Sequence, residues 1–358
     1  MTDPVATPAT DADPATDSTP APAVSELRRR LGWVAVGIWA AALVTFIATQ
    51  GFPFDRGYQT LWILSGLLAA SVGRTWRDVG RIFVDWVPVI VILYLYDFSR
   101  HAAEALGRPV AITPQIDADR ILFFGVVPTV WLQEHVYDPN ATHWWDAVGS
   151  LWYISHFLGV WAIAAILYLR DRDHWFKWTR ALVVLSFAGL VTFALIPTAP
   201  PWYAAREGIL PAIDRISTRG LDMVGLHGAK QLIDLGAATA NDVAAIPSLH
   251  TAFAVLIAVW FWPRVPQQHR WWLRPFLVAY PIVMLAVLVY SGEHYVIDGI
   301  IGAIYVFGVL WALRVWDRWR ARRAQERAEA EQLDAEAEAL EGEQAVDLTT
   351  SSTPDPAS

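Results

Sequence analysis

Apolar runs alternate with short polar segments along most of this chain. Most runs are roughly 16–22 residues long, the length that an α-helix needs to cross the ~30 Å hydrocarbon core of a membrane. The sequence therefore predicts an all-α polytopic membrane bundle of about eight transmembrane helices, or seven if the short second run is only partly embedded. The predicted spans are 31–50, 59–73, 82–98, 149–169, 179–196, 247–263, 274–291 and 295–316.

Composition agrees with this pattern, since 55% of the 358 residues are hydrophobic. The formal net charge of −8 gives no sign of a nucleic-acid partner, and we expect none, because the charge arises in the two tails. Residues 1–26 hold five acidic side chains, and residues 324–358 hold ten against the single basic Arg327. We expect a disordered N-terminal tail over 1–27. The charged acidic C-terminal tail over 317–358 is expected to continue the last span as a solvated helix.

Loop charges predict the topology of the chain. Short loops rich in Lys and Arg stay in the cytoplasm, and with the N-terminus inside, 19 of the 27 basic residues fall in cytoplasmic segments. We therefore expect a multi-pass protein of the cell membrane with both termini in the cytoplasm. The first span follows Arg28, Arg29 and Arg30 and is expected to be an uncleaved anchor.

The same topology places two long loops outside the cell, over residues 99–148 and 197–246. We expect residues 28–98 to form N-terminal transmembrane helices and residues 99–316 to form a catalytic membrane domain that carries these loops. The apolar stretch 121–132 of the first long loop is too short to span a membrane and predicts an interfacial or re-entrant helix. In the second long loop, the prolines of IPTAPPWY must end the preceding helix near Ile196.

A pair of polar residues at the mouth of the last predicted span is the first candidate for chemistry. The chain has no cysteine, so His, Asp, Glu, Ser and Lys must carry any reaction. The segment VYSGEHYVIDG puts His294 and Asp298 four residues apart, on one face of a helix. A carboxylate that accepts the proton of one ring nitrogen leaves the other nitrogen's lone pair free, which makes the imidazole a nucleophile.

A second polar segment, AAIPSLH, places Pro247, Ser248 and His250 at the start of the sixth predicted span. Free backbone N–H groups in the first turn of a helix favour an anion such as phosphate. On the predicted topology His250 lies at the same outer level as His294. Two such imidazoles can share the roles in a two-step covalent phosphoryl transfer. One acts as the nucleophile and the other as the acid that protonates the leaving oxygen. This chemistry needs no metal and no cofactor, and we expect neither.

These segments carry a family resemblance. PSLH, followed 44 residues later by the histidine of HYVID, resembles the PSGH and H-x-x-x-D motifs of the type 2 phosphatidic acid phosphatase superfamily. With IPTAPPWY and GEHYVID, the chain is most similar to the branch typified by inositol phosphorylceramide synthase, over about residues 90–316. The resemblance implies a six-helix core with His294 as nucleophile, Asp298 as its orienting partner and His250 as general acid. It also implies that Ser248 and the backbone around Pro247 bind phosphate.

The chain departs from this superfamily in its cations. The superfamily's phosphatases usually carry a Lys-x6-Arg-Pro motif, which is missing here, and an arginine six residues before the nucleophilic histidine, where this chain has Leu288. The synthase branch is similar in lacking this pattern. We expect Arg206 to supply the phosphate-binding charge, with Tyr203 of the same segment as a further substrate contact. Other candidates in the first long loop are Arg100, Arg108 and Arg120.

The sequence thus predicts an integral membrane lipid phosphotransferase that moves a phospholipid head-group phosphate to an alcohol acceptor through a phosphohistidine intermediate. Its expected partners are the membrane and a phospholipid or lipid-phosphate substrate, and no pattern points to an oligomeric state. With water as acceptor, the same residues would make a lipid phosphate phosphatase. A zinc hydrolase is less favoured because the H-E-x-x-H spacing is absent. A transporter is less favoured because the ionisable cluster lies at one face instead of mid-span.

Overall fold

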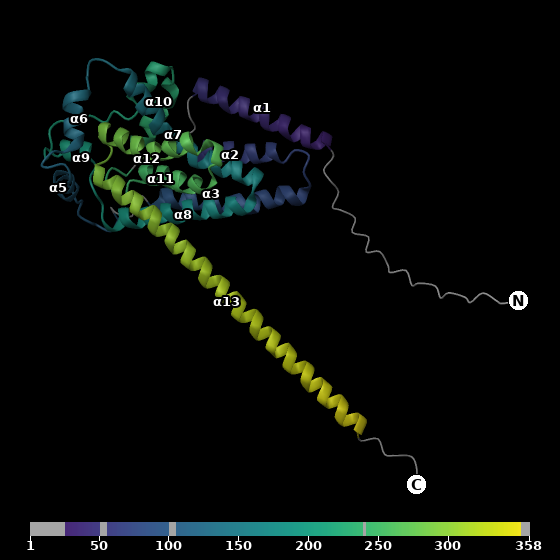
Figure 1. Cartoon of the computed structure of the whole chain (residues 1–358). Coiled ribbons are helices and arrows are strands. Elements are labelled where there is room, and N and C mark those ends of the chain that lie inside the picture. The colour runs from purple at the N-terminus through teal and green to yellow at the C-terminus, as the bar shows by residue number, and fades with distance from the viewer. Residues whose placement is uncertain (1–25, 51–55, 100–104, 239–240, 352–358) are drawn as a thin grey trace, which may run out of the picture. The chain divides into compact units, whose positions relative to one another are not determined.

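Helices account for the regular structure of the chain in its computed structural model, which describes residues 26–50, 56–99, 105–238 and 241–351. Each of the eight predicted spans coincides with a helix, which confirms the all-α prediction (Figure 1). The helices are α1 (Glu26–Gln50), α2 (Arg56–Ala70), α3 (Trp76–Ser99), α5 (Thr113–Leu122), α6 (Pro128–Val136), α7 (Trp144–Arg170), α8 (Arg172–Leu195), α9 (Pro201–Arg206), η1 (Arg219–Val224), α10 (His227–Ala238), α11 (Leu249–Phe261), η2 (Trp262–Arg264), η3 (Gln267–His269), α12 (Arg270–Tyr290) and α13 (Val296–Ser351).

Five helices within the described ranges are long and apolar enough to cross a membrane: α1, α7, α8, α12 and α13. Helices α2 and α11 are apolar but shorter, as the short second run predicted for α2. Helix α13 continues as a helix to Ser351, which confirms the helical continuation of the last span into the acidic tail. The predicted N-terminal tail over residues 1–27 lies almost wholly outside the described residues. These helices make the chain a polytopic membrane protein.

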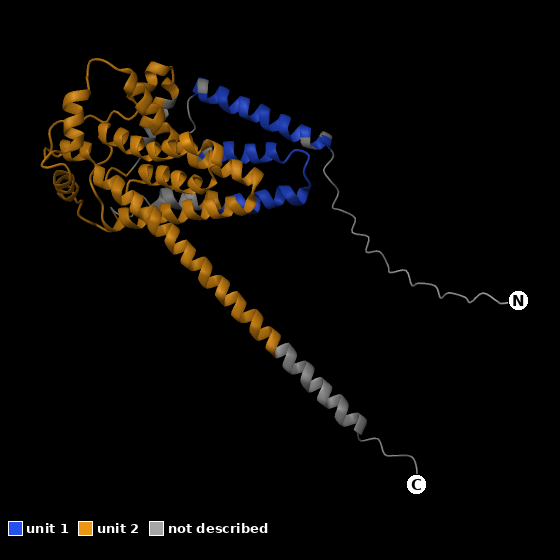
Figure 2. Cartoon of the chain, viewed as in Figure 1, with its two compact units in different colours: residues 1–88 blue, residues 89–358 orange. Residues whose placement is uncertain are grey.

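The chain divides into two compact units, Met1–Pro88 and Val89–Ser358 (Figure 2). In the first unit, α1 and α2 pack through aromatic side chains, and the indole N–H of Trp39 donates to the hydroxyl of Ser65 at 3.1 Å. The expected catalytic stretch 99–316 falls entirely within the second unit.

The second unit is built around α11, which packs against α7, α8, α12 and α13. Its interior includes the fully buried Trp178, whose indole N–H donates to the carbonyl of Val160 at 3.2 Å. The start of α11 lies close to α13 at Gly302, where an added Cβ would lie 2.6 Å from the carbonyl oxygen of Ser248. A glycine is therefore required for the start of α11 to lie directly against α13.

The first long loop differs from its prediction. Instead of one helix over 121–132, α5 ends at Leu122 and α6 begins at Pro128. The turn between them contains Phe124 at φ 54° and Gly125 at φ 97°, and proline is favoured where α6 begins because its φ suits a first helical position. The predicted single helix is wrong for this local reason. The ring of Phe124 is 98% exposed, so the turn presents an apolar tip.

The two long loops are joined by a short extended segment at Thr198, just after α8 ends near Ile196 as predicted. The backbone N–H of Thr198 donates to Val243 at 2.8 Å, and that of Ala199 donates to Ala111 at 2.9 Å. The hydroxyl of Thr198 accepts the N–H of Ile246 at 2.8 Å. These bonds hold the approach to α11 against both loops.

Replacing Gly302 by alanine tests the close contact between α11 and α13. We expect Gly302→Ala to destabilise the protein by about 1–3 kcal/mol, because backbone atoms at Ser248 must move to admit the methyl group. Gly308→Ala, in the same helix with no heavy atom within 4 Å of the added Cβ, is the matched control. Thermal unfolding of the detergent-solubilised variants measures the effect. Equal stability of the two variants would contradict the packing described here.

Candidate active site

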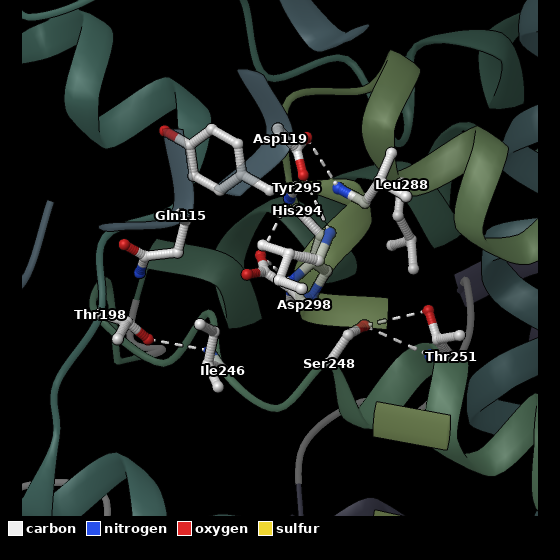
Figure 3. A network of polar contacts seen from close by, with 12 residues as sticks. Gln115, Asp119, Thr198, Ile246, Ser248, Thr251, Leu288, His294, Tyr295 and Asp298 are labelled. Atoms are coloured by element: carbon white, nitrogen blue, oxygen red, sulfur yellow. Dashed lines mark hydrogen bonds and ion pairs between the residues drawn. The ribbon is translucent and has the colours of Figure 1, made fainter. Parts of the chain in front are cut away.

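The predicted contact between His294 and Asp298 is present at the start of α13. The Nδ1 atom of His294 lies 3.3 Å from Oδ2 of Asp298, and both side chains are buried (Figure 3). The same carboxylate oxygen accepts the backbone N–H of Tyr295 at 2.9 Å. Asp298 therefore fixes both the ring of His294 and the turn that carries it.

His250 lies beside His294, with their ring centroids 5.7 Å apart. It belongs to the first turn of α11, and its ring stacks on Tyr153 of α7 at 5.2 Å. A third imidazole, His156 of α7, lies 4.1 Å from His250 by ring centroids. The Nε2 atom of His250 is buried without a hydrogen-bonding partner among the described residues. The structure thus brings the two histidines of the separate sequence segments together, one held by a carboxylate and one in an aromatic pocket.

Ser248 connects these two segments directly. Its backbone N–H donates to the carbonyl oxygen of Asp298 at 3.1 Å. Its side chain caps α11 by accepting the N–H of Thr251 at 3.3 Å, and its hydroxyl donates to the hydroxyl of Thr251 at 3.2 Å. Ser248 is fully buried, and the peptide bond between Ile246 and Pro247 is cis. The predicted phosphate-binding pair Pro247 and Ser248 therefore lies at the junction of α11 and α13.

Leu288 occupies the position where the related phosphatases usually have an arginine, and its side chain is fully buried. Its carbonyl oxygen accepts the N–H of Glu293 at 3.0 Å and that of His294 at 3.3 Å. Within this turn Gly292 has φ 76°, and an added Cβ would lie 2.8 Å from Ile213. Position 288 thus organises the turn before His294 through its backbone and brings no charge to the site.

Asp119 of α5 is a residue that sequence reasoning missed. Its Oδ2 accepts the N–H of Val296 and its Oδ1 that of Ile297, both at 3.0 Å, so it caps the first turn of α13 (Figure 3). Burial raises the pKa of the Asp119 carboxyl above its ordinary value. The capped helix is 177 positions away in sequence, and a lone aspartate in PQIDADR gives no local signal of that contact.

An ion pair lies next to the nucleophile candidate and was also missed. The Nε–H of Arg215 donates to Oε1 of Glu293 at 2.8 Å, and the hydroxyl of Ser217 donates to the same oxygen at 2.7 Å. Burial lowers the pKa of Arg215, but the Glu293 carboxylate outweighs it, so that this pKa is raised above its ordinary value. The guanidinium therefore stays charged, and its partner Glu293 is the residue directly before His294.

The expected cation Arg206 lies at the end of α9, where its guanidinium is 4.3 Å from the ring centroid of Tyr203. Its Nη1 is 3.6 Å from the carboxylate of Asp242, and its Nε is 3.6 Å from that of Glu207. Half of the side chain is exposed. The structure brings Arg206 and Tyr203 together, and the described part of the chain shows neither in contact with His250 or His294.

The other candidate cations have separate positions. Arg120 is half-exposed and lies 3.6 Å from Asp117 on its own helix, and Arg108 is exposed. Arg100 lies outside the described residues. Within the ranges that the structure describes, no group of three or more His, Asp and Glu side chains is arranged to hold a metal ion.

The helical membrane bundle and its pair of histidines, taken with a family match, are those of a membrane enzyme that acts on lipid phosphoesters. A model of the PAP2 superfamily matches residues 116–312, and the chain belongs to this superfamily. The predicted resemblance is thereby confirmed. The match covers both histidines and Asp119, Arg215 and Glu293, but leaves out the first compact unit.

Two known relatives are similar to this chain. The phosphoinositol dihydroceramide synthase of Bacteroides thetaiotaomicron is 22% identical over 236 residues, which cover 62% of this chain and 73% of the relative. The inositol phosphorylceramide synthase catalytic subunit of Saccharomyces cerevisiae is 25% identical over 260 residues, which cover 68% of this chain and 60% of the relative. No solved structure matches the chain.

Removal of the Asp119 carboxylate tests its role as the cap of α13. We expect Asp119→Ala to lower the free energy of unfolding by about 1–2 kcal/mol, because two partly buried N–H groups lose their acceptor. Asp117→Asn, on the same helix but exposed, is the control. Both variants are compared by thermal unfolding and by activity. An Asp119→Ala variant with the stability and activity of the control would rule out the capping role.

Proposed function

We propose that this enzyme transfers the phosphoinositol head group of a phospholipid to the hydroxyl group of a second lipid, a ceramide-like long-chain amide alcohol, through a phosphohistidine. The observation that carries the proposal is the pairing of two imidazoles from separate segments, of which only His294 is held by a carboxylate. The head group and the acceptor are inferred from the two relatives, which are named as synthases of phosphoinositol dihydroceramide and of inositol phosphorylceramide.

In the first step, His294 is the nucleophile. With its Nδ1–H donated to Asp298, the Nε2 lone pair attacks phosphorus, and an N–P bond forms. The P–O bond to diacylglycerol breaks, and His250 in its protonated form gives its proton to the departing oxygen. Diacylglycerol leaves, and the inositol phosphate stays on His294.

In the second step, the acceptor hydroxyl takes the place that diacylglycerol left. His250, now neutral, removes the hydroxyl proton while the acceptor oxygen attacks phosphorus and the N–P bond breaks. Water in this step would give a hydrolase instead. The burial of His294 and Asp298 supports a lipid acceptor, since a dry site disfavours attack by water.

The remaining predicted residues have roles around this centre. Ser248 and the backbone at Pro247 are proposed to contact the phosphoryl oxygens, a role supported by their position, since the bond from Ser248 N–H to the carbonyl of Asp298 holds them against the first turn of α13. Arg206, whose side chain is half-exposed, and the neighbouring Tyr203 are proposed to contact the head group. We place the site on the extracytoplasmic face of the cell membrane and both termini in the cytoplasm, because 19 of the 27 basic residues then lie inside.

Incubation of purified protein with labelled phosphatidylinositol, with and without added ceramide, tests this function. The wild type is expected to form a ceramide-linked inositol phosphate and diacylglycerol. His294→Ala is expected to abolish the transfer, and His250→Ala to slow it by about 10²–10⁴-fold, because the leaving oxygen loses its acid. His227→Ala, which removes an exposed histidine bound to Asp222, is the control.

Two results would contradict the proposed function. Transfer by His294→Ala at the wild-type rate would exclude this histidine as nucleophile. Release of free inositol phosphate in place of the ceramide product, even with ceramide present, would make the protein a hydrolase of lipid phosphodiesters.

A further inference from the structure

The transfer reaction needs positive charge at the phosphoryl group, which the family pattern does not supply here. Charge that develops on the phosphoryl oxygens must be met by cations or N–H donors within the site. The usual arginine position holds Leu288, which is buried and apolar. The arginine expected from sequence, Arg206, is half-exposed and lies between the carboxylates of Glu207 and Asp242.

We propose that Arg215 is the phosphate-binding cation of this site, held in place by Glu293 and donating its free N–H groups to the phosphoryl oxygens. The proposal rests on the proposed function for the identity of the phosphoester, while the binding of a phosphate group is a property of the site itself.

The position of Arg215 supports this role. Its Nε lies 2.8 Å from Oε1 of Glu293, the residue that directly precedes His294. Arg215, which comes from the second long loop, is therefore bound to the residue next to the candidate nucleophile.

The orientation of the guanidinium leaves donors for a ligand. Glu293 takes the Nε–H, and the guanidinium carbon lies 5.3 Å from the ring centroid of Trp202. On the described part of the chain, neither Nη nitrogen of Arg215 has a hydrogen-bonding acceptor. A guanidinium can donate two parallel N–H bonds to a phosphate, and one that is already fixed loses less entropy on binding. The side chain is one-third exposed, so a ligand can reach it.

Glu293 fits the role of a positioning residue. It is 7% exposed and accepts from both Arg215 and Ser217 through one oxygen. The hydroxyl of Ser217 in turn lies beside that of Tyr153, whose ring stacks on His250. Glu293 thus ties the cation to the element that carries the nucleophile and, through Ser217, to the pocket of His250.

The competing explanation is that Arg215 only neutralises the buried carboxylate of Glu293. Breaking a buried ion pair by removing one partner is destabilising, because the other charge is left uncompensated. The two explanations differ in the double variant Arg215→Gln/Glu293→Gln, which has no buried charge to neutralise. A purely neutralising Arg215 predicts that the second substitution restores phosphate binding, whereas a phosphate-binding Arg215 predicts no recovery.

Binding of inorganic phosphate, measured through its thermal stabilisation of the detergent-solubilised full chain, tests the proposal without requiring turnover. We expect the wild type to be stabilised, and the apparent Kd for phosphate to rise about 10- to 100-fold in Arg215→Gln and equally in the double variant. The Kd of Arg215→Lys is expected to lie between those of the wild type and Arg215→Gln, because lysine keeps the charge and loses the planar pair of donors. Arg180→Gln, which removes an arginine bound by two oxygens of Asp317, is the control and keeps the wild-type Kd.

Three outcomes would overturn the proposal: a wild-type Kd in Arg215→Gln, recovery of the wild-type Kd in the double variant, and a wild type that phosphate does not stabilise. Failure of the proposed function has a different signature. If phosphate binding depends on Arg215 but no head group is transferred to ceramide, the phosphate-binding role of Arg215 is supported and the proposed transferase function is contradicted. If transfer depends on His294 while Arg215→Gln binds phosphate with the wild-type Kd, the phosphate-binding role of Arg215 is contradicted and the proposed function is not.

Discussion

The direct contact between the first turns of α11 and α13 is the constraint on which the rest of the site depends. The N–H of Ser248 donates to the carbonyl oxygen of Asp298, and Gly302 admits the backbone of Ser248 at a distance that a side chain would prevent. His250 lies in the first turn of α11, and His294 lies two residues before the start of α13. Because the two starts are held together, His250 and His294 lie with ring centroids 5.7 Å apart, although 44 residues separate them.

The loops around this contact supply partners to several polar groups near the histidines. Asp119 supplies an acceptor to the first turn of α13, whose N–H groups would otherwise be buried without a partner. Glu293 is matched by Arg215 and Ser217. An isolated buried charge costs several kcal/mol, so each carboxylate near the histidines has a specific partner. The two long loops are therefore part of the site, and we infer that they determine how a phosphoryl group is held there.

The sequence was sufficient for features that depend on local periodicity. Each span predicted from an apolar run coincides with a helix of the structure. The four-residue spacing of His294 and Asp298 likewise predicted their contact. The break between α5 and α6 was missed because the prediction used the length and hydropathy of the stretch 121–132 and gave too little weight to the turn-forming Gly125 and Pro128.

Contacts between distant loops could not be predicted in the same way. Asp119 and Arg215 reach the start of α13 across 177 and 78 positions, and their partners are backbone amides or a glutamate inside a turn. Neither residue lies on a periodic face, so no spacing rule marks it. The clustering of His156 and Tyr153 around His250 likewise depends on how α7 packs against α11.

The most direct test of the account is to identify the atom that carries the transferred group. Excess enzyme would be mixed with inositol-labelled phosphatidylinositol without an acceptor, quenched in alkali, and digested for mass spectrometry over the course of one turnover. The account predicts an inositol phosphate adduct on the peptide that contains His294, formed as diacylglycerol is released. Diacylglycerol release with no adduct at any time, or an adduct on a different residue, would contradict it.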